Sequence, residues 1–156
     1  MSIEIDFDVL DYSFLYKPLL VGGQSMEYYG LRKAGIDIDL IIHQDDHEQL
    51  KQKYPNHIKD LYGDIGICEY GFEIWNHICN FDYDYLKEKA IEEEKYLVIS
   101  LEKAMVLKAI AMKIPKYHRD LELISDLMIK KRLMGKHNVI CSFPCLALRA
   151  FGTEKV

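Results

Sequence analysis

Residues 20–40 read LVGGQSMEYYGLRKAGIDIDL, and this stretch says most about the fold. An apolar run over residues 18–22 ends at a glycine pair and predicts a short buried strand. Residues 24–31 can form two helical turns. Residues 36–43 alternate, then become apolar and rich in isoleucine, which predicts a second strand. The expected order is therefore strand, glycine turn, short helix and strand.

Two acids, Asp37 and Asp39, stand two positions apart in the second predicted strand. Residues two apart on a strand point to the same face. Two like charges on a half-buried face need compensation, because each is costly to remove from water. A divalent cation such as Mg²⁺, bound by both carboxylates, would supply it. The alternative is a solvated sheet edge with the isoleucines pointing inward, and Asp-Ile-Asp alone favours that alternative.

The glycine pair Gly22-Gly23 favours a ligand site, because it follows an apolar strand and precedes a helix. Glycines let the backbone approach a ligand closely, and the first turn of a helix offers free N–H groups to a phosphate. A plain turn is the alternative for the glycines alone. The combination with two acids on one face of the next strand is more specific.

This combination resembles the signature of the nucleotidyltransferase superfamily, whose fold is the polymerase-beta type. Val21-Gly22-Gly23 is followed by thirteen residues and then by Asp37-Ile38-Asp39-Leu40. Residues 30–32 resemble small bacterial members related to AbiEii-type toxins. Those members often carry Thr or Ser two residues before the first Asp, where this chain has Gly35.

A second region, residues 96–124, resembles the family only loosely. Residues 98–108 look like its segment that enters a helix and carries an inward lysine, here Lys108. Lys116 and Asp120 resemble the element that follows. Asp120 would orient Lys108 or Lys116, or cap the last helix, and capping is the reading the sequence favours.

The resemblance implies a third carboxylate on a neighbouring strand. Glu73 is the best candidate, since it stands in the middle of a predicted strand, and an exposed strand acid is the alternative. The rivals are Asp64, Glu69 and Asp82.

The resemblance implies a Mg²⁺-dependent transfer of a nucleoside monophosphate from an NTP to an unknown hydroxyl acceptor. Asp37, Asp39 and Glu73 would be the catalytic, metal-binding acids. The nucleotide-binding residues would be Gly22, Gly23, Ser25, Arg32 and Lys108. For Arg32 a solvated loop charge is the alternative, and for Lys108 a side chain that snorkels to water. The acceptor would be a small molecule, a protein or an RNA.

A second hypothesis is a catalytically inactive nucleotidyltransferase-fold binding protein, such as a toxin–antitoxin component. Gly35 and the uncertain third acid favour it. Either protein would act alone, as a homodimer or with a partner protein. A small scaffold without a site is a third hypothesis, which predicts that Asp37 and Asp39 face bulk water.

The remaining patterns predict one α+β domain over residues 1–156, a nucleotidyltransferase-like mixed sheet flanked by helices with a helical C-terminal part. Residues 45–53 predict a helix capped by Asp45 or Asp46, and residues 65–70 and 72–78 predict a hairpin that turns at Gly71. A charged helix is expected over residues 84–95. Ser100 is a good N-cap, and a last helix would run from His118 or Asp120 to Met134, with Gly135 after it.

Composition fits a cytoplasmic globular protein. The 156 residues are 49% apolar and 29% charged, with a net charge of −5, which argues against a protein whose main task is to grip nucleic-acid backbone. We expect no membrane helix and no signal peptide. The four cysteines should be reduced, and metal sites at Cys141/Cys145 or His43/His47 are disfavoured against packing and capping.

Overall fold

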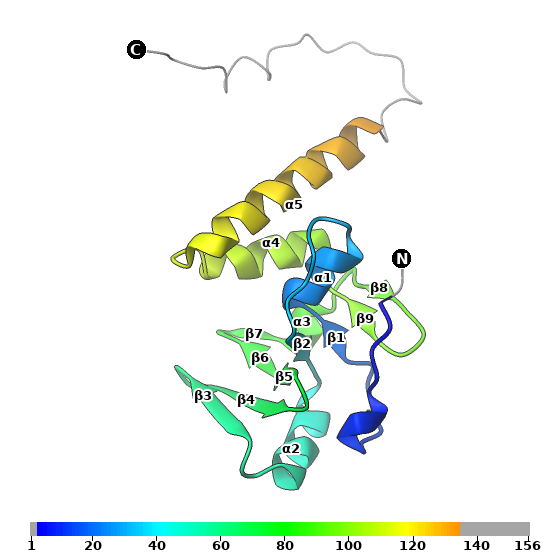
Figure 1. The fold of residues 1–156 in the computed structure, drawn as a ribbon, viewed down its shortest axis with the longest axis vertical. Helices are drawn as coiled ribbons and strands as arrows, with labels where there is room; N and C mark the ends of the chain where they lie inside the picture. The colour runs from blue at the N-terminus through cyan, green and yellow to red at the C-terminus, as the bar shows by residue number, and fades with distance from the viewer. Residues whose placement is uncertain (1–2, 135–156) are drawn as a thin grey trace.

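A mixed sheet of seven strands forms the centre of the computed structural model, which describes residues 3–134 (Figure 1). Its strands are β1 (Leu19–Leu20), β2 (Ile38–Ile41), β3 (Ile58–Leu61), β4 (Asp64–Glu69), β5 (Phe72–Trp75), β8 (Ile91–Glu92) and β9 (Leu97–Val98). The strand order is β3-β4-β5-β2-β1-β9-β8. β2 runs parallel to β5 and antiparallel to β1, so it lies in the middle of the sheet. The α+β class is confirmed.

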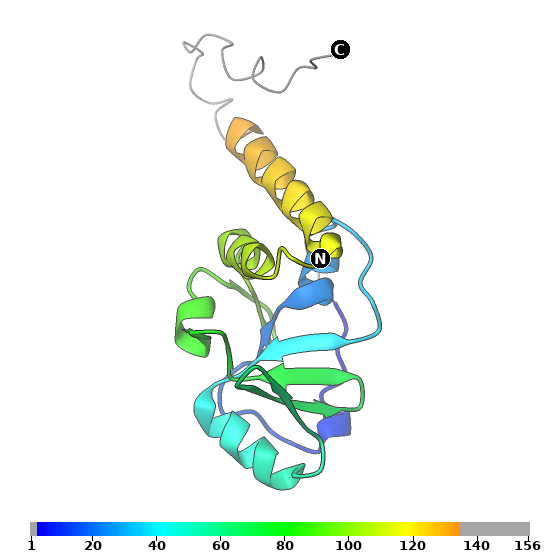
Figure 2. The same ribbon diagram turned by 90° about the vertical axis from the view of Figure 1, so that its left-hand side faces the viewer.

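Helices cover both faces of this sheet. They are η1 (Asp8–Leu10), α1 (Gly22–Tyr28), α2 (Gln44–Lys53), α3 (Tyr83–Leu86), α4 (Leu101–Ile110) and α5 (Pro115–Met134). The views in Figures 1 and 2 agree that α4 and α5 lie together at one end of the molecule and α2 at the other. A small ribbon of β6 (His77–Ile78) and β7 (Phe81–Asp82) stands apart from the main sheet.

The sheet is apolar on both faces, and alternation along β2 divides its side chains between two cores. Leu40 packs into a cluster with the N-terminal segment and Leu50 of α2. Ile41 packs into the other cluster, with residues of α1, α3, α4 and α5. Since Asp39 is two residues from Ile41, its side chain points towards the face that carries α1, α4 and α5.

The predicted hairpin is confirmed, with Glu69 opposite Phe72 across a two-residue turn. Tyr70 and Gly71 have φ angles of 50° and 82°, as in the primed turns that match the twist of a hairpin. Ser100 is the N-cap of α4, and its hydroxyl accepts a hydrogen bond from the Lys103 N–H.

Several predicted boundaries are wrong. The charged helix over residues 84–95 is only the four-residue α3, which is followed by Lys89 in a left-handed conformation (φ 58°) and by β8. α5 begins at Pro115 rather than at His118 or Asp120, since proline suits the first position of a helix. β2 begins at Ile38, and Ile36 is 92% exposed outside it.

Within residues 3–134, no helix is both long enough and apolar enough to cross a membrane. Cys68 and Cys79 are free thiols, as expected. The predictions for Gly135, Cys141 and Cys145 lie outside the described residues.

Candidate active site

Asp39 and Glu73 are direct neighbours in the centre of the sheet. β2 and β5 run parallel, and their register places Asp39 opposite Glu73 and Ile41 opposite Trp75. Both acids therefore point to the face that carries α1 and α4. The alternative of a solvated edge is wrong for Asp39, which is half-buried in a central strand.

Gly22 lies directly against the Asp39 carboxylate. It has a φ of +60°, and a Cβ built on it would come within 1.8 Å of Asp39 Oδ2. Glycine is required here for two reasons, the left-handed backbone and the missing side chain. A Cβ on Gly23, by contrast, would make only ordinary contacts of 3.6 Å and longer. The glycine turn thus cradles an acid of the chain itself.

Burial raises the pKa of Asp39 above its ordinary value, and the nearby Glu73 carboxylate adds to the rise. The Gly23 N–H and the Lys108 ammonium act in the opposite direction but do not offset it. The local field at Asp39 is therefore short of positive charge, and a cation placed between the two carboxylates would supply it.

Asp37 is exposed and directly precedes β2. It nevertheless lines the same cavity of about 470 Å³ as Asp39, Gly22 and Gly23. The structure therefore brings the two predicted acids to one site, although they do not share a strand. Gly35 also lines this cavity, and a Cβ there would meet nothing within 4 Å.

Of the four candidates for the third carboxylate, only Glu73 is the register partner of Asp39. The others have different tasks. Asp64 accepts a hydrogen bond from the Cys79 N–H and pairs with His77, Glu69 pairs with His57, and Asp82 caps α3. The exposed-acid alternative is also wrong for Glu73, which is half-buried.

Glu73 has a cationic partner that the sequence did not predict. Lys59 of β3 reaches across β4, and its ammonium lies 3.0 Å from Glu73 Oε1. Only the pairing of β3 with β4 brings Lys59 close. A lysine in an apolar stretch of sequence suggests a functional role, as it did for Lys108. Lys59 gives no such indication, because it stands in a strand that is exposed throughout.

The donor set suits a hard cation. Asp37, Asp39 and Glu73 offer carboxylate oxygens, which Mg²⁺ prefers together with water and phosphate. Within residues 3–134, no three His, Cys, Asp or Glu side chains lie close enough together in this structure to hold a metal ion. For all three acids to meet at one ion, their side chains would have to move closer together, and Lys59 would compete with the ion for Glu73.

The two predicted phosphate-binding cations are tied together by Asp120. Arg32 donates two hydrogen bonds to this carboxylate, of 2.6 and 2.9 Å, and the Lys108 ammonium lies 3.0 Å from Asp120 Oδ2. Asp120 stands in the second turn of α5, so the capping prediction is wrong and the orienting one is confirmed for Lys108. Arg32 is likewise no freely solvated loop charge.

This ion cluster is buried, with Lys108 and Asp120 side chains 9% and 3% exposed. Burial opposes ionisation of Asp120, but the hydrogen bonds from Arg32 and Lys108 outweigh it and lower the pKa of Asp120. Burial lowers the pKa of Lys108. Lys108 also lines the cavity that holds Asp37 and Asp39, and Lys116 stands on the same wall.

Ser25 does not line the polar cavity beside Asp37. Its side chain is buried, and its hydroxyl donates to the carbonyl oxygen of Gly22. It thereby supports the turn that holds Asp39.

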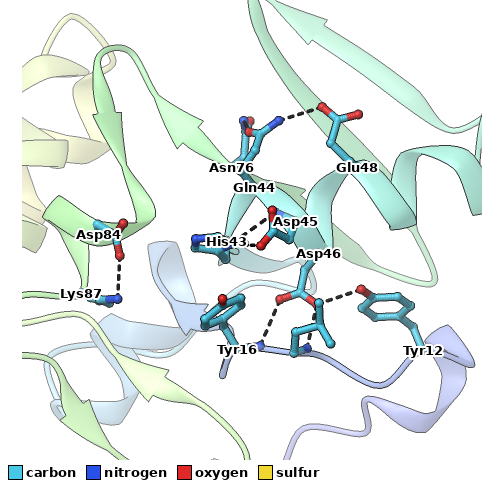
Figure 3. Close-up of polar contacts among 11 residues, drawn as sticks. Tyr12, Tyr16, His43, Gln44, Asp45, Asp46, Glu48, Asn76, Asp84 and Lys87 are labelled. Atoms are coloured by element: carbon cyan, nitrogen blue, oxygen red, sulfur yellow. Dashed lines mark hydrogen bonds and ion pairs between the residues drawn. The ribbon is translucent and has the colours of Figure 1, made fainter.

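His43 and His47 do not form a shared site. The ring of His43 caps α2 by accepting from the Asp45 N–H, so the predicted cap residue is wrong by two or three positions. His47 is buried and contacts the carbonyl oxygen of Ile65. Asp46 binds the N-terminal segment, where it accepts from the Tyr12 hydroxyl and the Tyr16 N–H (Figure 3).

No family model matches the sequence, and comparisons with curated proteins and with solved structures found no match.

Proposed function

We propose that the chain is a Mg²⁺-dependent nucleotidyltransferase that transfers a nucleoside monophosphate from an NTP to a hydroxyl acceptor. The observation that carries this proposal is the pair Asp39 and Glu73 on adjacent parallel strands, with Gly22 against the Asp39 carboxylate. A nucleotidyltransferase-like sheet with a helical C-terminal part is the corresponding fold.

The acids would hold Mg²⁺, which, when bound, neutralises charge on the phosphates. Asp39 and Asp37 line a cavity of about 470 Å³ that has room for a triphosphate. Arg32 and Lys108 stand on the wall of this cavity, already aimed by Asp120. The acceptor oxygen would form a bond to the α-phosphorus while the bond to pyrophosphate breaks, and Glu73 would take the acceptor proton.

Isothermal calorimetry with each of the four NTPs, with and without Mg²⁺, tests the proposal. We expect binding that requires Mg²⁺ and is lost in Asp39→Ala and in Glu73→Ala. Glu69→Ala is the matched control, since it removes the strand acid directly before the turn, on the other strand of the hairpin. Binding by none of the NTPs would overturn the proposal, as would equal binding by Asp39→Ala.

The second candidate is an inactive binding protein of the same fold. The pairing of Glu73 with Lys59 favours it, because a carboxylate engaged by lysine is not available to a metal. The two candidates differ in one variant. Lys59→Met should increase Mg²⁺ affinity in an enzyme whose Glu73 turns to the metal, and should leave it unchanged in a protein that uses no metal.

A further inference from the structure

A second cavity, of about 250 Å³, is lined by Asp39 and Glu73 but not by Asp37. Its walls come from the sheet and from the segment that includes α4 and the link to α5. Most of its lining is apolar, with Trp75, Leu107, Ala111 and Ile114 among its residues. It shares Gly22, Asp39, Lys108 and Tyr117 with the polar cavity, so the two spaces adjoin at the acids.

The size and chemistry of this space restrict what it can bind. Pockets for drug-sized ligands usually measure about 300–1,000 Å³, so about one ring system fits. Asp39, Asp64 and Glu73 line it and would repel an anion. A nucleobase is a poor fit, because buried polar groups on its edge need partners. Ser25 and Lys108, which could donate to the acceptor atoms of a base, are already engaged with Gly22 and Asp120, and the lining carboxylates only accept hydrogen bonds.

We propose that this apolar cavity binds the uncharged, apolar body of the acceptor and thereby places the acceptor hydroxyl at Asp39 and Glu73. The inference rests on the proposed function and names its acceptor class, an alcohol or phenol on an apolar group of about one ring. The hydroxyl loses its proton to a carboxylate and forms the new bond to the α-phosphorus, while pyrophosphate leaves with the bonding electrons.

Trp75 is the only tryptophan of the chain and lines the cavity, so it reports on occupancy. The probe is 4-iodobenzyl alcohol, whose iodine quenches indole fluorescence on contact, and 4-iodobenzoate is the charged counterpart. We expect saturable quenching by the alcohol and only weak, linear quenching by the benzoate. Linear quenching by the alcohol, or equal binding of both probes, would overturn the proposal.

Two pairs of variants test the location. Ala111→Leu fills the cavity and should weaken the alcohol about tenfold, the effect of roughly 1.4 kcal/mol. Ala109→Leu, on the exposed side of α4, should not. Ile114→Asn makes the lining polar, and the protein should still fold because Ile114 is 47% exposed. Ile110→Asn is the control, because Ile110 is 45% exposed and does not line the cavity. Equal affinities within both pairs would overturn the proposal.

The nucleotide separates this inference from the proposed function. Alcohol and Mg²⁺-NTP should bind together, with neither displacing the other. Displacement of the alcohol by the nucleotide would assign the cavity to the nucleobase and overturn the acceptor assignment. Saturable alcohol binding without any NTP binding in calorimetry would overturn the proposed function, and the acceptor role with it, and leave only an apolar binding site.

Discussion

At the scale of single residues, the site is built around the contact between Gly22 and Asp39. The left-handed φ of Gly22 turns the chain from β1 into α1, and its missing side chain leaves room for the Asp39 carboxylate. Asp39 is thereby fixed beside Glu73, where burial and the neighbouring carboxylate raise its pKa. A buried acid with a shifted pKa beside a second carboxylate is typical of functional sites.

Gly22→Ala should reduce both stability and cation binding, whereas Gly23→Ala should not. Alanine at position 22 adds left-handed strain and displaces Asp39 Oδ2, which together should cost about 1–3 kcal/mol. Alanine at position 23 fits and should be neutral or slightly stabilising. Urea unfolding of both variants checks this, and an unchanged Gly22→Ala would show that the contact is not tight.

Asp39→Asn should stabilise the protein at neutral pH. The folded state raises the pKa of Asp39, so folding favours the protonated acid. That contribution is complete below the ordinary pKa of 3.8 and is lost as pH rises through the raised value. The advantage of the variant should therefore be largest at pH 7 and vanish below pH 3.8.

Thermal unfolding between pH 3 and 8 measures this difference, and Mg²⁺ provides the contrast. The ion should stabilise the wild type and leave Asp39→Asn nearly unchanged, because it binds the folded site only. A wild type that is more stable than the variant at pH 7 without Mg²⁺ would contradict the assigned cause of the pKa shift.

Some residues of the candidate site could be predicted from the sequence, and others could not. Asp37 and Asp39 were predicted because two acids in an apolar strand pattern are unusual, and Glu73 because the family resemblance implies a third carboxylate on a neighbouring strand. The pairing of Lys59 with Glu73 and the sharing of Asp120 by Arg32 and Lys108 depend on contacts between residues 12 to 88 positions apart. Local periodicity carries no information on such distances.

At the scale of elements, β4 and β5 fit together through a glycine. Gly66 stands opposite Trp75, and a Cβ on Gly66 would meet atoms of the indole ring at 2.7 Å. A glycine within a strand often marks such a close approach. The flat ring can therefore lie across β4 and form part of the wall of the apolar cavity.

Gly66→Ala should displace Trp75 and destabilise the fold by about 1–3 kcal/mol, the usual cost of overpacking. The fluorescence of Trp75 should shift to longer wavelength as the ring moves towards water. Gly35→Ala is the control, because a Cβ there meets nothing within 4 Å. A variant with unchanged emission and stability would mean that the ring moves aside at no cost.

Elements whose sequence pattern was strong were predicted with nearly correct boundaries. Tyr70-Gly71 turns a hairpin by local chemistry, and Ser100 caps α4 in the same way. The prediction of a charged helix over residues 84–95 was wrong, because strand pairing outweighs local helix propensity there. Residues 91–92 form β8 against β9, which a composition rich in Glu and Lys does not predict.

At the scale of the whole molecule, Asp120 joins two consecutive helices to a loop far away in the sequence. It connects α5 to Lys108 on α4 and to Arg32 on the loop between α1 and β2. In addition to the apolar packing of α4 and α5 against the sheet, this carboxylate links the helical end of the molecule in Figure 1 to the loop that precedes β2, beside the polar cavity. Removing one partner of a buried ion cluster is costly, because the remaining charges lose their compensation.

Asp120→Asn should accordingly cost about 3–5 kcal/mol and weaken nucleotide binding at the same time. Glu122→Gln is the matched control on the same helix. It breaks only the exposed pair with Arg119, and should change stability by less than about 1 kcal/mol.

The pKa of Asp120 is lowered in the folded state, so its contribution to stability is present above pH 3.8 and is lost as pH falls through the lower folded value. The loss of stability in Asp120→Asn should therefore be full at pH 7 and smaller below pH 3.8. Urea unfolding at pH 7 and below pH 3.8 measures this difference. An equal effect of the two substitutions would show that the helices are held to the sheet by apolar packing alone.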